Sequence, residues 1–169
     1  MSIYKAVIFD LDDTIINTSQ IKHLRKKPWN ECYNNISTKT FALFGEDLIS
    51  VLKEKNLKVG IVTNSPKPYA SRVLSHHKFN YDNLICYHDC SKRKPHPDPL
   101  LMCASNLQVN PENIVSIGDN VNDIRASSQA KMLSVGVTWG ESTESELKSV
   151  NADYIVNETS ELVNLLKKI

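Results

Sequence analysis

The chain repeats one pattern, in which a short apolar run is followed by a segment with the helical spacing of apolar residues. Runs that are apolar at nearly every position are typical of parallel strands buried on both faces. Strands that alternate with helices form a parallel sheet with helices on both of its faces. The sequence therefore predicts a doubly wound, Rossmann-like α/β fold, with strands at 3–9, 57–63, 83–86, 113–119, 132–137 and 154–156.

Helical patterns fill most of the gaps between these runs. Asn56 stands where a left-handed residue is expected to end the first helix. Ser65 is expected to cap the second helix, with Pro66 in its first turn. The predicted helices lie at 45–56, 65–77, 98–107, 122–130 and 159–168.

Length and composition indicate one soluble domain. With 169 residues, 41% of them hydrophobic, the chain can bury one substantial core, and its net charge of +1 implies no strongly charged partner. Its four cysteines are scattered, its first residues lack a secretion-signal pattern, and no stretch approaches the roughly 20 apolar residues of a membrane span. We therefore predict a cytoplasmic protein that binds no membrane and is a monomer or a homodimer.

One polar segment, residues 17–40, breaks the alternation. Its basic residues are Lys22, Arg25, Lys26, Lys27 and Lys39, and its one acidic residue is Glu31. We expect a single domain over 1–169, in which 17–40 is a small basic cap that leaves the site open and attracts anionic substrates. Trp29 could stack on the base of a nucleic-acid end. A solvated charged loop is the alternative interpretation of this segment.

Polar and charged residues gather where the predicted strands end. The carboxyl ends of parallel strands share one edge of the sheet, and ligands bind at that edge. Asp10 and Asp12 are two apart on an extended segment, so their carboxylates can face one site. The later strand ends and the segments that follow them supply Thr63, Asn64, Lys94, Asp119 and Asp123.

Such a cluster of carboxylates calls for a cation. Two unit charges about 4 Å apart interact by roughly 4 kcal/mol at an effective dielectric constant near 20. Thr63 and Asn64 precede a helix start, where backbone N–H groups and the helix dipole favour an anion. Asp13 should point away from Asp10 and Asp12 and serve as a turn or helix-cap carboxylate.

Four stretches resemble, in order, the motifs of the haloacid dehalogenase-like hydrolase superfamily. They are "DLDDT" at 10–14, "IVTNS" at 61–65, "KPHP" at 94–97 and "GDNVND" at 118–123. A fifth stretch, "VGVTWG" at 135–140, is similar to the phosphoglycolate phosphatase-like branch, here with a reduced cap. The resemblance covers nearly the whole chain except 17–40.

The resemblance implies hydrolysis of a phosphomonoester through an aspartyl-phosphate intermediate. Asp10 would be the nucleophile, and Asp12 would be the general acid and then the general base. Thr63 and the Asn64 backbone would bind phosphate oxygens, and Lys94 would offset the negative charge of the phosphoryl group. The substrate class expected is a phosphorylated metabolite or a nucleotide.

The resemblance also implies a Mg²⁺ cofactor. Asp10, the Asp12 carbonyl and Asp119 would ligate it, and Asp123 would support either the metal shell or Lys94. Hard oxygen ligands of this kind suit Mg²⁺. Phosphoryl transfer depends mostly on positioning and on cations, which agrees with this set of residues.

Several alternatives stay open at this point. The substrate could be macromolecular, such as a phosphorylated nucleic-acid end or a protein, or the fold could be a non-catalytic phosphate- or protein-binding module. Cys86, His88 and Cys90 form a weak candidate for a zinc site. The family usually has a glycine at the position of Gln108, so either Asn106 takes the left-handed position or the turn differs.

Overall fold

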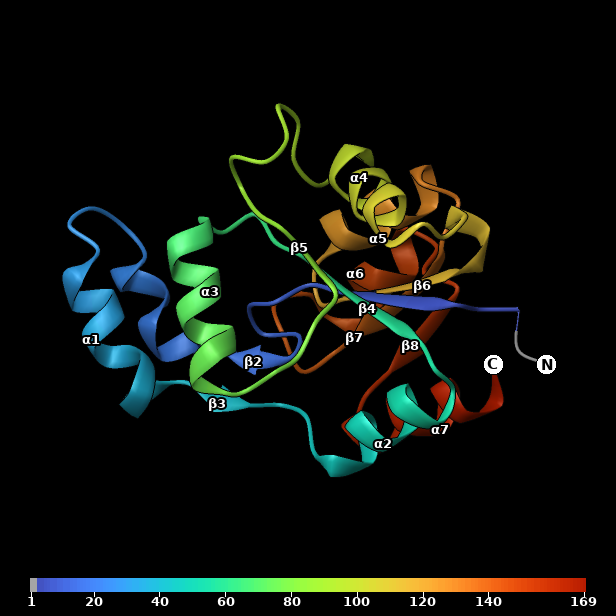
Figure 1. Ribbon diagram of the computed structural model, residues 1–169, viewed down its shortest axis with the longest axis horizontal. Coiled ribbons are helices and arrows are strands. Elements are labelled where there is room, and N and C mark those ends of the chain that lie inside the picture. Colours follow the sequence, from blue (N-terminus) through green and yellow to red (C-terminus); the bar gives the residue numbers. More distant parts are fainter. Residues whose placement is uncertain (1–2) are drawn as a thin grey trace.

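A computed structural model describes residues 3–169 and has at its centre one six-stranded parallel sheet (Figure 1). The strand order is β5-β4-β1-β6-β7-β8, so the first strand of the sheet lies in its interior. The predicted fold class and all six predicted strands are confirmed. The strands are β1 (Ala6–Phe9), β4 (Lys58–Val62), β5 (Asn83–Ile85), β6 (Ile114–Gly118), β7 (Leu133–Val137) and β8 (Tyr154–Val156).

Helices cover both faces of this sheet. Alternate residues of β1 point to opposite faces and pack in two separate cores. Val7 and Phe9 pack in the core beneath α2 (Glu46–Glu54), α3 (Lys67–His76) and α7 (Thr159–Lys168). Ala6 and Ile8 pack on the other face, beneath α4 (Asp98–Leu107) and α5 (Val121–Gln129). Figure 1 shows these two helical layers on opposite sides of the strands. The sequence did not predict the short helix α6 (Glu144–Ser149) or the 3-10 turn η2 (Pro111–Asn113).

The basic segment is enclosed by a small antiparallel pair, in which β2 (Ile16–Asn17) is bonded to β3 (Phe41–Ala42). Between them lie the 3-10 helix η1 (Ser19–Leu24) and the helix α1 (Asn30–Lys39). Ile21, Cys32 and Ile36 are buried in the core that α3 also shares, and α1 packs against α3 beside the sheet (Figure 1). The segment therefore packs on the main domain instead of forming a separate core.

Helix boundaries agree only in part with the predicted caps. Asn56, which follows the C-cap Lys55 of α2, has a positive φ of 50°, as expected. Gln108, and not Asn106, is the left-handed residue that ends α4, with φ 56° and ψ 45°. The prediction for Ser65 was wrong, because α3 begins at Lys67 after an N-cap at Pro66.

Across residues 3–169, none of the helices combines the length and apolar character needed to cross a bilayer.

Candidate active site

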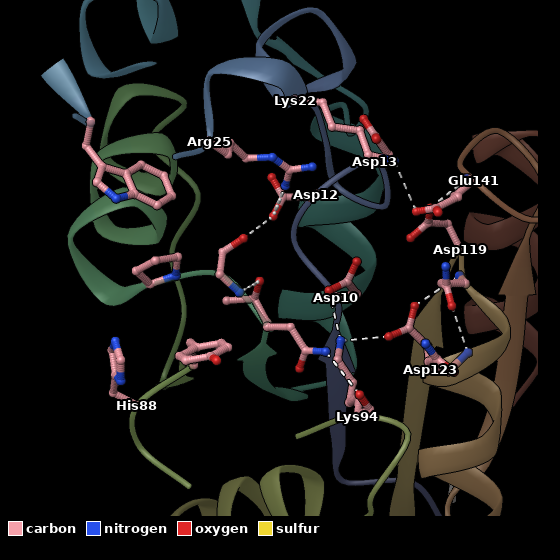
Figure 2. A pocket seen from close by; sticks show the side chains of 18 residues that line it. Asp10, Asp12, Asp13, Lys22, Arg25, His88, Lys94, Asp119, Asp123 and Glu141 are labelled. Carbon is pink, nitrogen blue, oxygen red and sulfur yellow. Dashed lines mark hydrogen bonds and ion pairs between the residues drawn. The ribbon is translucent and has the colours of Figure 1, made fainter. Parts of the chain in front are cut away.

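All seven residues predicted for the site line one open pocket at the carboxyl ends of β1, β4 and β6 (Figure 2). The pocket has a volume of about 560 Å³. Its wall also contains Lys22, Arg25 and Trp29 from the basic segment, together with Tyr87 and His88 from the loop after β5. The sheet edge thus brings together the site residues, which are as far apart in sequence as Asp10 and Asp123.

Lys94 lies at the centre of the site. Its Nζ is 2.9 Å from Asp10 Oδ1 and 2.7 Å from Asp123 Oδ1, and it donates a hydrogen bond of 2.8 Å to the Val62 carbonyl. The side chain is only 4% exposed. Burial acts to lower the pKa of Lys94, but the charges of Asp10 and Asp123 outweigh it and raise the pKa. The ammonium therefore stays charged and ties the end of β1 to the start of α5.

Asp10, Asp119 and Asp123 offer carboxylate oxygens that all lie within 4.8 Å of one another. Burial raises the pKa of Asp10 well above its usual range, and the neighbouring carboxylates raise it further while Lys94 lowers it. Burial and the charge of Asp123 also raise the pKa of Asp119. A compact set of hard oxygen donors whose charges are poorly compensated is a good fit for a small divalent cation such as Mg²⁺.

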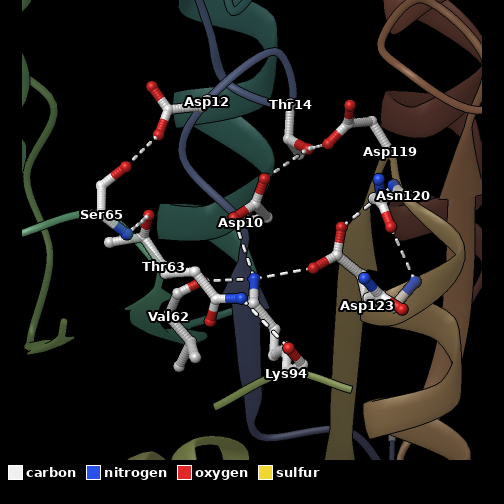
Figure 3. Close-up of polar contacts among 12 residues, drawn as sticks. Asp10, Asp12, Thr14, Val62, Thr63, Ser65, Lys94, Asp119, Asn120 and Asp123 are labelled. Carbon is white, nitrogen blue, oxygen red and sulfur yellow. Dashed lines mark hydrogen bonds and ion pairs between the residues drawn. The ribbon is translucent and has the colours of Figure 1, made fainter. Parts of the chain in front are cut away.

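Two glycines allow these carboxylates to reach their positions. A Cβ atom on Gly118 would lie 2.3 Å from the Cβ of Asp123, and one on Gly140 would lie 2.2 Å from Oδ2 of Asp119. Glu141, which follows Gly140, donates its backbone N–H to the same Oδ2 of Asp119 at 2.7 Å. Thr14 donates its hydroxyl to Asp119 Oδ1 at 2.9 Å (Figure 3). The orientation of Asp119 is therefore fixed from two sides.

The two oxygens of Asp123 are both engaged. Oδ1 contacts Lys94, and Oδ2 accepts a hydrogen bond of 3.0 Å from the N–H of Asn120 in the capping box of α5. Of the two roles expected for Asp123, this geometry favours support of Lys94.

Asp12 points to the other side of the pocket, toward Ser65 (Figure 3). Its Oδ1 accepts hydrogen bonds from the hydroxyls of Thr18 at 2.8 Å and Tyr69 at 2.6 Å. Its Oδ2 accepts one from the hydroxyl of Ser65 at 2.7 Å and is 2.9 Å from Arg25 Nη1. The Asp12 side chain is not a member of the carboxylate cluster described above.

Asp13 is a turn residue, as expected. Its φ is 60°, and its Oδ1 accepts the N–H of Thr18, the residue that precedes η1, at 2.9 Å. The carboxylate therefore fixes the point where the basic segment leaves the strand.

Thr63 and Asn64 occupy the bend between β4 and α3. The Thr63 hydroxyl accepts the N–H of Ser65 at 3.0 Å, which leaves its own O–H free to donate into the pocket. The Asn64 side chain donates to the Lys94 carbonyl at 3.1 Å and so holds the lysine loop against this bend.

Sequence reasoning missed the residues that surround Asp12. Thr18, Tyr69 and Arg25 were not candidates for a contact with it, and Ser65 was assigned to a helix cap. Of the basic residues in the segment, Lys22 and Arg25 line the pocket, and Lys22 also forms an exposed ion pair of 3.5 Å with Glu141.

The possible zinc site did not gain support. Within residues 3–169, the three aspartates are the only group of three or more carboxylate, imidazole or thiol side chains that lies close enough together to hold a metal ion, and Cys86 and Cys90 are buried free thiols. His88 lines the pocket instead.

Comparison with known proteins places this chain in a family. Residues 27–137 match the family described as haloacid dehalogenase-like hydrolase. The phosphoglycolate phosphatase of Escherichia coli (strain K12) is 31% identical over 160 residues, which are 92% of this chain and 63% of that protein. The phosphoglycolate phosphatase of Salmonella typhi is 34% identical over 134 residues, which are 77% of this chain and 53% of that protein. This chain thus spans less than two thirds of the length of these relatives.

Solved structures of the same architecture include two with a TM-score of 0.83. One is a hydrolase from Pseudomonas syringae, 22% identical, for which the match covers 98% of this chain and 99% of that chain. The other is a predicted phosphatase from Clostridium acetobutylicum, 21% identical, with 99% and 100% covered. At these identities the solved structures support the fold alone. The match to the family over residues 27–137 shows that this chain belongs to the haloacid dehalogenase-like hydrolases.

Proposed function

We propose that this protein is a Mg²⁺-dependent phosphomonoester hydrolase that works through a phosphorylated Asp10. The observation that carries the proposal is the arrangement around Asp10. One oxygen of this carboxylate, which is 13% exposed, contacts Lys94, and the carboxylate lies in a cluster with Asp119 and Asp123 at the floor of an open pocket. Positive charge beside a buried nucleophile is what a phosphoryl group needs on approach.

In the proposed reaction, an oxygen of Asp10 attacks the phosphorus atom as the bond from phosphorus to the ester oxygen breaks. Asp12, which takes up a proton from solvent once the substrate is bound, gives this proton to the departing oxygen, so the product leaves as an alcohol. A water molecule then attacks the phosphorus of the aspartyl phosphate while Asp12 takes its proton. This second step releases inorganic phosphate and restores the Asp10 carboxylate, and Asp12 then returns its proton to solvent.

The other site residues would bind and orient the phosphoryl group. The hydroxyl of Thr63 and the backbone of Asn64 would donate to its oxygens at the start of α3, and Lys94 would offset its charge. Asp10, Asp119 and the Asp12 carbonyl would hold Mg²⁺, with Asp123 supporting Lys94. The metal ion would supply further neutralisation of negative charge on the phosphoryl oxygens.

The substrate that we propose is a small phosphorylated metabolite. The support comes from the curated relatives, which are named phosphoglycolate phosphatases, and from Lys22 and Arg25, which add positive charge to the pocket wall. A non-catalytic phosphate-binding module would have little use for a second carboxylate at Asp12. Two alternative substrates stay predictions: a nucleotide and a phosphorylated macromolecule. The cytoplasmic location and the monomeric or dimeric state are also predictions.

The test is release of inorganic phosphate from a panel of phosphorylated metabolites, nucleotides, phosphopeptides and phosphorylated DNA ends. We expect turnover of a small metabolite in Mg²⁺ and none after chelation. Asp153→Asn is a control on a carboxylate outside the pocket, where Asp153 accepts hydrogen bonds from Ser134. Turnover that persists after exhaustive chelation would refute the metal requirement, and loss of turnover in the control would show that the assay reports folding.

A further inference from the structure

The hydrogen-bonding capacity of the Asp12 carboxylate is fully used. An ionised carboxylate offers about four acceptor positions. Thr18 and Tyr69 occupy those of Oδ1, while Ser65 and Arg25 occupy those of Oδ2. A carboxylate that acts as an acid or a base must have one position free for the proton. One of these four donors therefore has to leave before Asp12 can act.

The exposed fractions of the four donor side chains indicate which donor is able to leave Asp12. The side chains of Thr18 and Tyr69 are fully buried, and Ser65 is 9% exposed at the bend before α3. Burial and the adjacent Asp12 charge raise the pKa of Tyr69 above its usual range, so its hydroxyl remains a donor. Arg25 differs, since it is long, belongs to the basic segment, lines the pocket and has a side chain that is 18% exposed.

Arg25 is also the donor that a substrate would attract. Its guanidinium carries five N–H groups, and the ion pair with Asp12 uses Nη1. Guanidinium groups bind phosphate oxygens in bidentate geometry, and a phosphate dianion carries more charge than one carboxylate. Figure 2 shows the Arg25 guanidinium over Asp12 on the wall of the pocket, next to the space that the substrate would enter.

We propose that Arg25 is a positioning residue that exchanges partners during substrate binding. Without substrate, Arg25 pairs with Oδ2 of Asp12 and holds this carboxylate on the α3 side. When a phosphoryl group enters, Arg25 moves to one of its oxygens, and Oδ2 of Asp12 becomes free for proton transfer. This role rests on the proposed acid and base function of Asp12, and it gives the basic segment a defined part in the reaction.

Binding of inorganic phosphate in the presence of Mg²⁺, measured by calorimetry, tests the exchange without any turnover. The four proteins are the wild type, Arg25→Gln, Asp12→Asn and the double variant. In the wild type, Arg25 has to give up Asp12 to bind phosphate, so its removal should raise the Kd only about two- to threefold. In the Asp12→Asn background the Asp12 charge no longer competes for Arg25, and the same removal should raise the Kd about tenfold or more, as for a charged hydrogen bond.

The non-additivity of these effects is the diagnostic result. Equal effects of Arg25→Gln in the two backgrounds, or no effect in either, would overturn the exchange. Arg25→Lys should keep part of the coupling because it keeps the charge. Lys26→Gln is the matched control, since it removes one positive charge from an exposed position of the same segment and should leave the Kd unchanged.

Failure of the exchange and failure of the proposed function give different results. A wild type that hydrolyses phosphomonoesters but shows additive effects would overturn the role of Arg25 alone. A wild type that binds no phosphate in Mg²⁺ would overturn both.

Discussion

Replacing Asp119 by Asn should stabilise the metal-free protein, because the site is built around charges that need a cation. Asp119 is the member of the carboxylate cluster without an ion pair to Lys94, which contacts Asp10 and Asp123. An amide keeps the local hydrogen bonds, since its oxygen can accept from the N–H of Glu141 and its NH₂ can donate to the Thr14 hydroxyl. The change therefore removes a charge and little else.

The size of the effect follows from the spacing of the cluster. At separations of up to 4.8 Å, each pair of carboxylates repels by about 3 kcal/mol at an effective dielectric constant near 20. Protonation and solvent reduce this, and we expect a net gain of about 1–3 kcal/mol in the free energy of unfolding. For a chain of this size that corresponds to a rise in Tm of roughly 3–10 °C.

The gain should depend on pH. The pKa of Asp119 is raised in the folded state, so the native protein loses stability as pH rises from the unfolded pKa, about 4, through the folded pKa. Asp119→Asn should therefore match the wild type at acid pH and exceed it at pH 8.

Thermal unfolding in EDTA at several pH values measures this effect, with Asp153→Asn as the matched control outside the cluster. Saturating Mg²⁺ should then raise the Tm of the wild type more than that of Asp119→Asn, because the variant has lost a ligand. A variant that is no more stable than the wild type at pH 8 in EDTA would refute the view that the carboxylate cluster is electrostatically strained when no metal is bound.

Three further predictions concern the same pocket. Ca²⁺ should suppress turnover in competition assays with Mg²⁺, because it is larger and takes 6–8 oxygens in looser geometry; full activity in Ca²⁺ would contradict this. Lys94→Met should abolish turnover and lower the unfolding free energy by about 3–5 kcal/mol at neutral pH, because two buried carboxylates lose their partner; a denaturant titration with unchanged stability would argue against the central role of this ion pair. Gly118→Ala should lower kcat strongly, because the added Cβ would lie 2.3 Å from Asp123; wild-type kinetics would mean that the backbone absorbs the clash.

The sheet and the residues at its edge could be predicted because they follow from local patterns. Apolar runs mark the strands, and parallel strands gather Asp10, Thr63 and Asp119 at one edge whatever the loops between them do. The small helix α6 was missed, although Thr143 and Glu146 form a capping box that the sequence contains. The left-handed turn at Gln108 was not predicted, because this position disfavours residues other than glycine.

The surroundings of Asp12 could not be predicted in the same way. Ser65 satisfies the local rule for a helix cap, but its hydroxyl binds a carboxylate 53 positions away. Arg25 reaches Asp12 only because the basic segment is fixed by the β2–β3 pair and packs on α3. These contacts depend on tertiary packing, for which a polar stretch of sequence gives no periodic signal.

The central claim is that Asp10 carries the phosphoryl group during turnover. The direct measurement is mass spectrometry of peptides from protein quenched in acid during steady-state turnover. Asp12→Asn is used to slow hydrolysis of the intermediate, with an aryl phosphate as substrate because its leaving group departs without protonation. We expect a phosphoryl group on the peptide that contains Asp10, dependent on Mg²⁺ and absent in Asp10→Asn. Active protein that shows no phosphorylated peptide under these conditions, or phosphorylation at a different residue, would contradict the proposed mechanism.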